Sequence, residues 1–228
     1  MRKPCVPLLA AVSLILMFAC SAPPEEAGAP LGDVVGASWP VFRGDAAMSG
    51  VARDPIPDNL DLLWSFDTEA VIVSSPVIGR GRIYIGSTNG GVFALGLGDG
   101  RKVWEFFSDD DIEASPLILG GSVYIGDLSG QLFALDIDTG EVQWRFKALN
   151  SIYGSANWAP APDGSGSHIF VGSYDNRVYS LDAATGALNW SYETDNYING
   201  APATDGRHVI FGGCDEILHV ISTSDGTK

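Results

Sequence analysis

The sequence predicts an all-β protein made of repeated four-stranded antiparallel sheets. Tryptophans recur 40, 40 and 46 residues apart, and glycines that each close an apolar run recur at intervals of 40, 46 and 40. A proline stands ten residues before each of these glycines. The markers are Trp64, Trp104, Trp144 and Trp190; Pro76, Pro116, Pro162 and Pro202; Gly86, Gly126, Gly172 and Gly212. Four-stranded units of about 40 residues are typical of the blades of a β-propeller.

The second repeat illustrates the strands that we expect. Runs rich in Val, Ile, Tyr and Phe are bounded by Gly, Asp and Ser, which favour turns. The expected strands are residues 114–119, 122–127, 131–137 and 141–146. Beyond the N-terminus the sequence shows no helical periodicity, so helices are not expected in the repeats.

Each repeat ends in a motif that predicts how blades dock. Residues 134–144 read Ala-Leu-Asp-Ile-Asp-Thr-Gly-Glu-Val-Gln-Trp. The turn needs a residue that tolerates positive φ, and the following tryptophan, on the outermost strand, can fill the wedge between adjacent blades. We expect the following residues to be structural: Trp64, Trp104, Gly140, Trp144, Gly186 and Trp190.

The N-terminus predicts export. Arg2 and Lys3 precede an apolar stretch that is too short to span a bilayer and fits a secretory signal. The stretch ends at Ala19-Cys20, which resembles a bacterial lipobox, so residues 1–20 are expected to be a lipoprotein signal with Cys20 lipidated. The alternative is an ordinary signal peptide with an incidental cysteine. Residues 21–37 form an expected flexible linker, and residues 38–228 the propeller.

The docking motif is similar to that of the quinoprotein (PQQ) propeller repeat family, over residues 39–228. Residues 39–45 resemble the segment that precedes the first blade in that family. The resemblance implies about seven or eight blades, so the four present would form an incomplete ring. We therefore expect an N-terminal fragment of a longer propeller, with completion by a partner chain as the alternative.

The charge composition indicates which classes of partner the chain can bind. The formal net charge is −15, from 28 acidic and 13 basic residues, which disfavours nucleic acid and anionic membrane surfaces. Membrane contact is expected through the lipid anchor only. Once Cys5 is removed and Cys20 is lipidated, Cys214 stands alone, so no disulfide is expected within the mature chain.

Connections in an up-and-down blade emerge on two faces. We call the face with the connections between second and third strands and between successive blades the loop face, and the opposite face the turn face. The loop face is predicted to be acidic and aromatic, and its candidate binding residues are Tyr153, Trp158, Tyr174 and Tyr197. The alternative is that these rings only pack the loops. The third repeat has six extra residues between Trp144 and Pro162, which we expect to lengthen the loop face.

Quinoprotein dehydrogenases of this family hold their quinone over a vicinal disulfide, beside a calcium ion. The chain has no adjacent cysteines, and the acidic run 109–113 is expected to be a solvated loop rather than a calcium site. The three histidines, His168, His208 and His219, are expected to be structural. We therefore expect no catalytic residue, no metal site and no cofactor.

The preferred function is a non-catalytic scaffold. The chain resembles BamB-type accessory lipoproteins of outer-membrane β-barrel assembly, which implies a periplasm-facing outer-membrane lipoprotein with protein partners on its loop face. The alternative is a fragment of a PQQ-dependent alcohol or sugar dehydrogenase, with PQQ and calcium as cofactors. A ligand-sensing module is a third possibility.

Overall fold

The computed structural model describes residues 38–52 and 58–228. These residues form strands, turns and bends and contain no helix, and hence no helix that could cross a bilayer. The predicted signal segment 1–20, with Cys20, and the predicted linker 21–37 lie outside the described residues.

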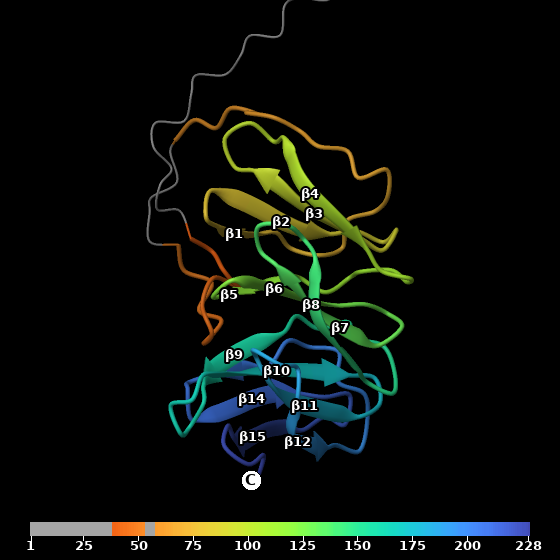
Figure 1. Cartoon of the computed structure of the whole chain (residues 1–228). Helices are drawn as coiled ribbons and strands as arrows, with labels where there is room; N and C mark the ends of the chain where they lie inside the picture. Colours follow the sequence, from red (N-terminus) through yellow and green to blue (C-terminus); the bar gives the residue numbers. More distant parts are fainter. Residues whose placement is uncertain (1–37, 53–57) are drawn as a thin grey trace, which may run out of the picture.

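The described strands form four antiparallel sheets that follow one another in chain order (Figure 1). The first sheet contains β1 (Val77–Gly79), β2 (Arg82–Gly86), β3 (Gly91–Gly96) and β4 (Lys102–Phe107), and the second β5 (Leu117–Leu119), β6 (Ser122–Gly126), β7 (Gln131–Asp136) and β8 (Val142–Lys147). The third contains β9 (Asn157–Pro160), β10 (Ser167–Ser173), β11 (Arg177–Asp182) and β12 (Leu188–Glu193), and the fourth β13 (Ala203–Thr204), β14 (His208–Gly212) and β15 (Leu218–Ser222). Consecutive strands pair in every sheet, which confirms the predicted propeller architecture. Within the described residues the four sheets do not close into a ring.

The second sheet tests the predicted strands directly. Three of its strands agree with the prediction to within a residue, but β5 begins at Leu117 and not at residue 114. The difference has a local cause. The backbone N–H of Ser115 donates to Oγ of Ser155 in the next unit, 3.1 Å away, so this stretch bonds to its neighbour blade instead of to β6.

The hydrophobic core lies between successive sheets. One buried cluster joins Tyr84 of the first sheet to Phe133 of the second, and another joins Leu132 of the second to Ile169 of the third. A third cluster joins the last two sheets. All five residues of β6 are buried because neighbouring sheets cover both of its faces. Each blade therefore depends on its neighbours for most of its burial.

The leading segment, residues 38–50, ties the four units together. Trp39 exchanges two backbone hydrogen bonds of 2.9 Å with β1, and the carbonyl of Pro40 accepts one of 2.7 Å from β5. The carbonyl of Ala46 accepts a backbone bond of 2.8 Å from β13 and a side-chain bond of 2.8 Å from β9. The donors and acceptors on the four sheets are Ile78, Ile118, Asn157 and Thr204. The segment thus bonds to the innermost strand of every sheet.

The six extra residues of the third unit lie on the turn face, so the prediction that they lengthen the loop face is wrong. His168 of β10 pairs with Ala159 of β9, as Ser122 pairs with Leu119 in the second sheet. Residues 160–167 connect the first pair, whereas residues 120–121 suffice for the second. The prediction failed because it treated Pro162 as the counterpart of Pro116, which placed the extra residues before the first strand of the third unit. The structural counterpart of Pro116 precedes β9 directly and is Ala156.

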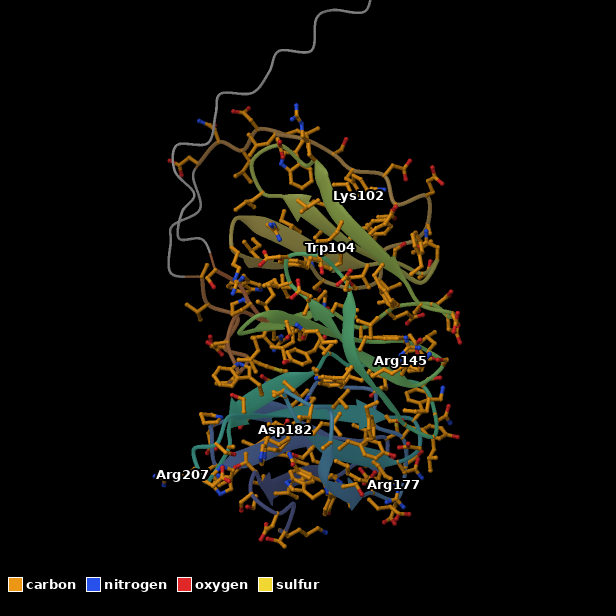
Figure 2. The ribbon with its side chains drawn as sticks, in the orientation of Figure 1. Lys102, Trp104, Arg145, Arg177, Asp182 and Arg207 are labelled. Carbon is orange, nitrogen blue, oxygen red and sulfur yellow. The ribbon has the colours of Figure 1, made fainter. Side chains whose placement is uncertain are left out.

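The two faces lie at opposite ends of the strands. In Figure 2 Arg207, in the β13–β14 turn, marks the turn face, and Arg177, the first residue of β11, lies on the opposite side near the loop face.

Candidate functional site

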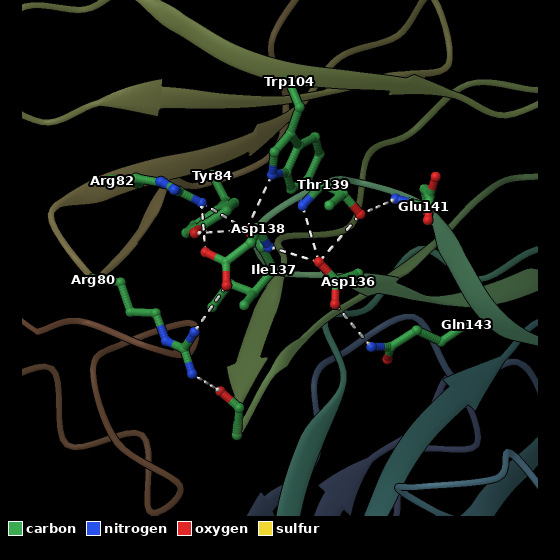
Figure 3. Close-up of polar contacts among 11 residues, drawn as sticks. Arg80, Arg82, Tyr84, Trp104, Asp136, Ile137, Asp138, Thr139, Glu141 and Gln143 are labelled. Atoms are coloured by element: carbon green, nitrogen blue, oxygen red, sulfur yellow. Dashed lines mark hydrogen bonds and ion pairs between the residues drawn. The ribbon is translucent and has the colours of Figure 1, made fainter.

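On the turn face, each tryptophan of the repeat contacts the unit that follows it. Nε1 of Trp104 donates a hydrogen bond of 3.0 Å to the carbonyl of Ile137 (Figure 3). The same bond joins Trp64 to Leu97 at 3.0 Å, Trp144 to Ala183 at 3.0 Å and Trp190 to Thr223 at 3.1 Å. The four contacts are nearly identical, so this face holds the blades together in a repeated way.

A glycine in each turn makes room for the indole ring. Gly140 has a φ of +75°, and a Cβ placed on it would lie 2.7 Å from Cε3 of Trp104. Gly186 lies in the same way against Trp144. The glycine and the tryptophan of one motif therefore belong to different contacts: Gly140 receives the ring from the preceding unit, while Trp144 reaches forward to the next. The sequence alone did not reveal this connection.

Aspartate carboxylates accept backbone hydrogen bonds within these turns and so stabilise them. Oδ1 of Asp136 accepts hydrogen bonds from the backbone N–H groups of Thr139, at 2.9 Å, and Asp138, at 3.0 Å (Figure 3). These bonds hold the pKa of Asp136 below its usual value because they favour the charged carboxylate. Asp182 bonds to the N–H of Thr185 in the same manner, at 2.8 Å.

Two arginines also cross from the first unit to this turn. Nη1 of Arg82 donates to the carbonyl of Ile137 and to Oδ1 of Asp138, both at 3.0 Å (Figure 3). Nη1 of Arg80 lies 3.3 Å from Oδ2 of the same carboxylate. The Asp138 side chain is 57% exposed, so solvent weakens both ion pairs.

On the loop face, the linkers between blades are bonded to the turns on either side of them. The backbone N–H of Ile112 donates to Ser87 of the first unit, and the linker residue Asp111 accepts from Leu128 of the second. The same two bonds recur at the next linkers, where they join Ile152 to Asp127, Tyr174 to Ser151, Ile198 to Ser173 and Cys214 to Tyr197. The backbone of the loop face is therefore fixed by a repeated network.

A linker isoleucine explains three of the four recurring glycines. A Cβ on Gly126 would lie 2.3 Å from Cγ2 of Ile152, which is fully buried. Gly86 and Gly172 stand against Ile112 and Ile198 in the same way. Because these glycines lack a side chain, the isoleucine of the linker can pack directly against the backbone.

Three of the four candidate aromatic residues form a continuous stack on the loop face. The ring centroids of Tyr153 and Tyr174 are 4.4 Å apart at an interplanar angle of 38°, and those of Tyr174 and Tyr197 are 4.9 Å apart at 8°. The three rings, which we call the tyrosine stack, come from a linker, a turn and the next linker. Tyr197 is 47% exposed. Trp158 lies apart, on β9, where it packs against the buried cluster that includes Val41.

The loops that carry the stack approach one another closely. A Cβ on Gly154 would lie 2.5 Å from the carbonyl oxygen of Gly200, so the two linkers nearly touch. The N–H of Tyr197 also donates to Oδ1 of Asn196, at 2.9 Å. These contacts hold the stack in place in the free chain.

The linkers and turns of the loop face carry acidic but no basic residues, although Lys147 and Arg177 stand at the strand ends beside them. The linkers 68–76, 108–116, 148–156 and 194–202 and the turns 87–90, 127–130, 174–176 and 213–217 contain no lysine, arginine or histidine. They contain Glu69, Asp109, Asp110, Asp111, Glu113, Asp127, Asp175, Asp195, Asp215 and Glu216. Burial raises the pKa of Tyr153, with smaller contributions from Tyr174 and from the charges of Glu113 and Asp110.

Two buried acceptor atoms on this face have no hydrogen-bond partner among the described residues. Oδ1 of Asp127 accepts from Ser129 and from the N–H of Gln131, both at 2.8 Å, but its Oδ2 is unpaired although the residue is fully buried. Oδ1 of Asn176 is also unpaired. Sequence reasoning did not identify either atom, because both residues look like ordinary turn formers.

The carboxylate of Asp215, in a turn of the loop face, is buried. The side chain of Asp215 is 3% exposed, and its Oδ2 lies 2.8 Å from Nε2 of His219. Nδ1 of His219 lies 3.1 Å from the hydroxyl of Tyr192. This buried chain of contacts gives His219 a packing partner on either side. His208 contacts Asp205 on the turn face at 3.0 Å.

The described residues do not fit a calcium–quinone site. In residues 38–52 and 58–228, no three His, Cys, Asp or Glu side chains are grouped so that they could hold a metal ion. Cys214 is a free, exposed thiol, and the sequence has no neighbouring cysteine for a vicinal disulfide.

Sheets that dock through a repeated tryptophan–glycine contact define a β-propeller of the PQQ-like repeat type. The chain belongs to the family described as outer membrane protein assembly factor BamB, whose model matches residues 57–161 and 154–228. No curated protein sequence matches the chain.

Solved structures agree with this assignment. BamB from Moraxella catarrhalis is 25% identical, with a TM-score of 0.60 over 70% of this chain. The match covers 52% of that protein, so the chain spans about half the length of its relative. Quinohemoprotein alcohol dehydrogenase from Comamonas testosteroni (18% identity, TM-score 0.69, 83% of this chain and 40% of that one) and the computationally designed Ika4 protein (15%, 0.58, 68% and 93%) share the fold.

Proposed function

We propose that the chain is a non-catalytic scaffold whose loop face binds a protein partner during outer-membrane protein assembly. The family and the similarity to BamB support the process. The tyrosine stack is the observation that carries the proposal: it is partly exposed and held in place by backbone contacts. Large, rigid aromatic rings bind partners at a low cost in conformational entropy.

The proposal includes export and lipidation at Cys20, so that the propeller faces the periplasm at the outer membrane. It requires neither quinone nor calcium. Mass spectrometry of the purified membrane-bound protein tests the anchor: a lipid-modified N-terminal Cys20 is expected. A mature N-terminus at another residue would contradict it.

Complementation tests the function. In the source organism, deletion of the gene is expected to lower the amount of folded outer-membrane β-barrel protein, and the intact gene to restore it. A variant with Tyr174→Leu and Tyr197→Leu should fail to restore it, whereas the turn-face control Asp163→Asn should succeed. Full restoration by the double variant would contradict the proposed role of the loop face.

The dehydrogenase alternative makes a different prediction. Full-length protein mixed with PQQ and calcium would reduce a dye in the presence of alcohols or sugars. The scaffold proposal predicts no such activity, and measurable turnover would overturn it.

A further inference from the structure

The tyrosine stack occupies positions at which the repeat does not require tyrosine. Tyr153 directly follows the isoleucine of linker 148–156, and Glu113 occupies the same position in linker 108–116. Tyr197 directly precedes the isoleucine of linker 194–202, and Asp111 occupies that position in linker 108–116. Tyr174 occupies the turn position that Leu128 occupies in the second unit. Because other units fold with unrelated residues at these positions, blade packing does not account for the stack.

The surroundings of the stack are complementary to a cation. Glu113 and Asp110 belong to linker 108–116, which precedes the linker of Tyr153 and is bonded to the turn of the second unit, and Asp195 is exposed two residues before Tyr197 at the other end. Two basic side chains stand at the strand ends on this face, and both are engaged within the chain: Nζ of Lys147 donates to the carbonyl of Ser129, and Arg177 pairs with Glu193.

We infer that the tyrosine stack and its flanking carboxylates bind an arginine-rich, extended segment of the partner protein. A guanidinium group can lie flat on an exposed tyrosine ring and at the same time donate two hydrogen bonds to a carboxylate. The stack is already ordered, so little conformational entropy is lost on binding. This inference rests on the proposed scaffold function and specifies the chemistry of the partner.

Fluorescence anisotropy tests the inference on the intact chain. The probe is a short fluorescein-labelled peptide of alternating arginine and glycine, with lysine–glycine and glutamate–glycine peptides for comparison. We expect the arginine peptide to bind most tightly, the lysine peptide more weakly and the glutamate peptide not at all. Binding should weaken as salt is added, because part of the attraction is between exposed charges.

A pair of matched variants separates the site from general attraction to an acidic protein. Glu113→Gln, beside the stack, is expected to weaken binding of the arginine peptide about threefold. Glu141→Gln removes the same charge from the turn face and should leave binding unchanged. Equal losses in the two variants would show attraction to net charge alone and would overturn the inference.

Tyr174→Leu and Tyr197→Leu test the rings. Each is expected to weaken the arginine peptide about tenfold while circular dichroism remains that of the unaltered chain. Tyr197 is partly exposed, so its variant should remain folded even if Tyr174→Leu does not. Absence of arginine-peptide binding, together with complementation that still needs the stack, would overturn this inference and leave the proposed scaffold function standing.

Discussion

The turn face and the loop face are built from the same strands but differ in what repeats. On the turn face the tryptophan bonds measure 3.0, 3.0, 3.0 and 3.1 Å, and each indole ring lies on a glycine. On the loop face the backbone network repeats but the side chains change, from Asp111 and Glu113 in linker 108–116 to Tyr153 and Tyr197 in the two linkers that follow.

This difference teaches where function can lie in a repeat protein. Side chains that every blade needs are used for blade-to-blade contact, and their changes are expected to cost stability. Side chains that differ between blades are free of that task. The loop face is therefore the part of the described chain where a binding surface can vary without loss of the fold.

The largest expected effect comes from removing one docking tryptophan. Trp104 is 7% exposed, so Trp104→Ala leaves a cavity between blades and should lower the free energy of unfolding by about 3–5 kcal/mol. Chemical denaturation measures the loss. The loop-face control Tyr197→Ala should change stability by about 0.5 kcal/mol or less. A comparable loss in both variants would remove the distinction between the faces.

A second change tests how tightly a linker packs on its glycine at the loop face. Gly126→Ala would force a methyl group against Ile152 and should cost about 1–3 kcal/mol. Gly121→Ala, where a Cβ meets nothing within 4 Å, is the matched control and should be nearly neutral. Ile152→Ala removes Cγ2, so in the double variant Gly126→Ala/Ile152→Ala the two losses should be less than additive. Fully additive losses would mean that this contact is not the cause.

Lowering the pH should reduce the free energy of unfolding, because Asp136 stabilises its turn as a charged carboxylate. Its folded pKa lies below the usual value of 3.8, so its contribution is complete above that pH and is lost as pH falls through the folded pKa. Asp136→Asn should therefore lower stability at neutral pH and reduce its dependence on pH below about 4. Denaturation curves at several pH values measure this dependence. An unchanged acid dependence in the variant would show that other carboxylates dominate.

The smallest expected effect concerns the exposed ion pairs. Asp138→Asn removes the charge that faces Arg80 and Arg82 and should cost about 0–1 kcal/mol, because these groups are solvated. The difference from Trp104→Ala would show that burial, and not charge, joins the blades. A loss as large as that of Trp104→Ala would contradict this ranking.

The sequence predicted most of the fold because the repeat appears in it directly. The tryptophan spacing and the alternating runs located the strands of the second sheet to within a residue, except at the start of β5. The alignment of Pro162 failed because proline is not required at that position, where Ala156 stands instead. The isoleucine that is buried in three of the linkers, at Ile112, Ile152 and Ile198, would have been the better marker.

The site was harder to predict than the fold. Spacing placed Tyr153, Tyr174 and Tyr197 on one face, but their stacking depends on how three loops approach one another. Trp158 was grouped with them only because the extra residues were assigned to the wrong face. The burial of Asp127 and Asp215 could not be predicted because acidic turn residues are usually solvated.

Hydrogen–deuterium exchange of the intact chain, with and without the arginine–glycine peptide, tests the separation of the two faces most directly. The account predicts slower exchange in residues 108–116, 148–156 and 194–202 when the peptide is present, and no change in the turns 136–140 and 182–186. Protection of those turns, or protection nowhere, would contradict it.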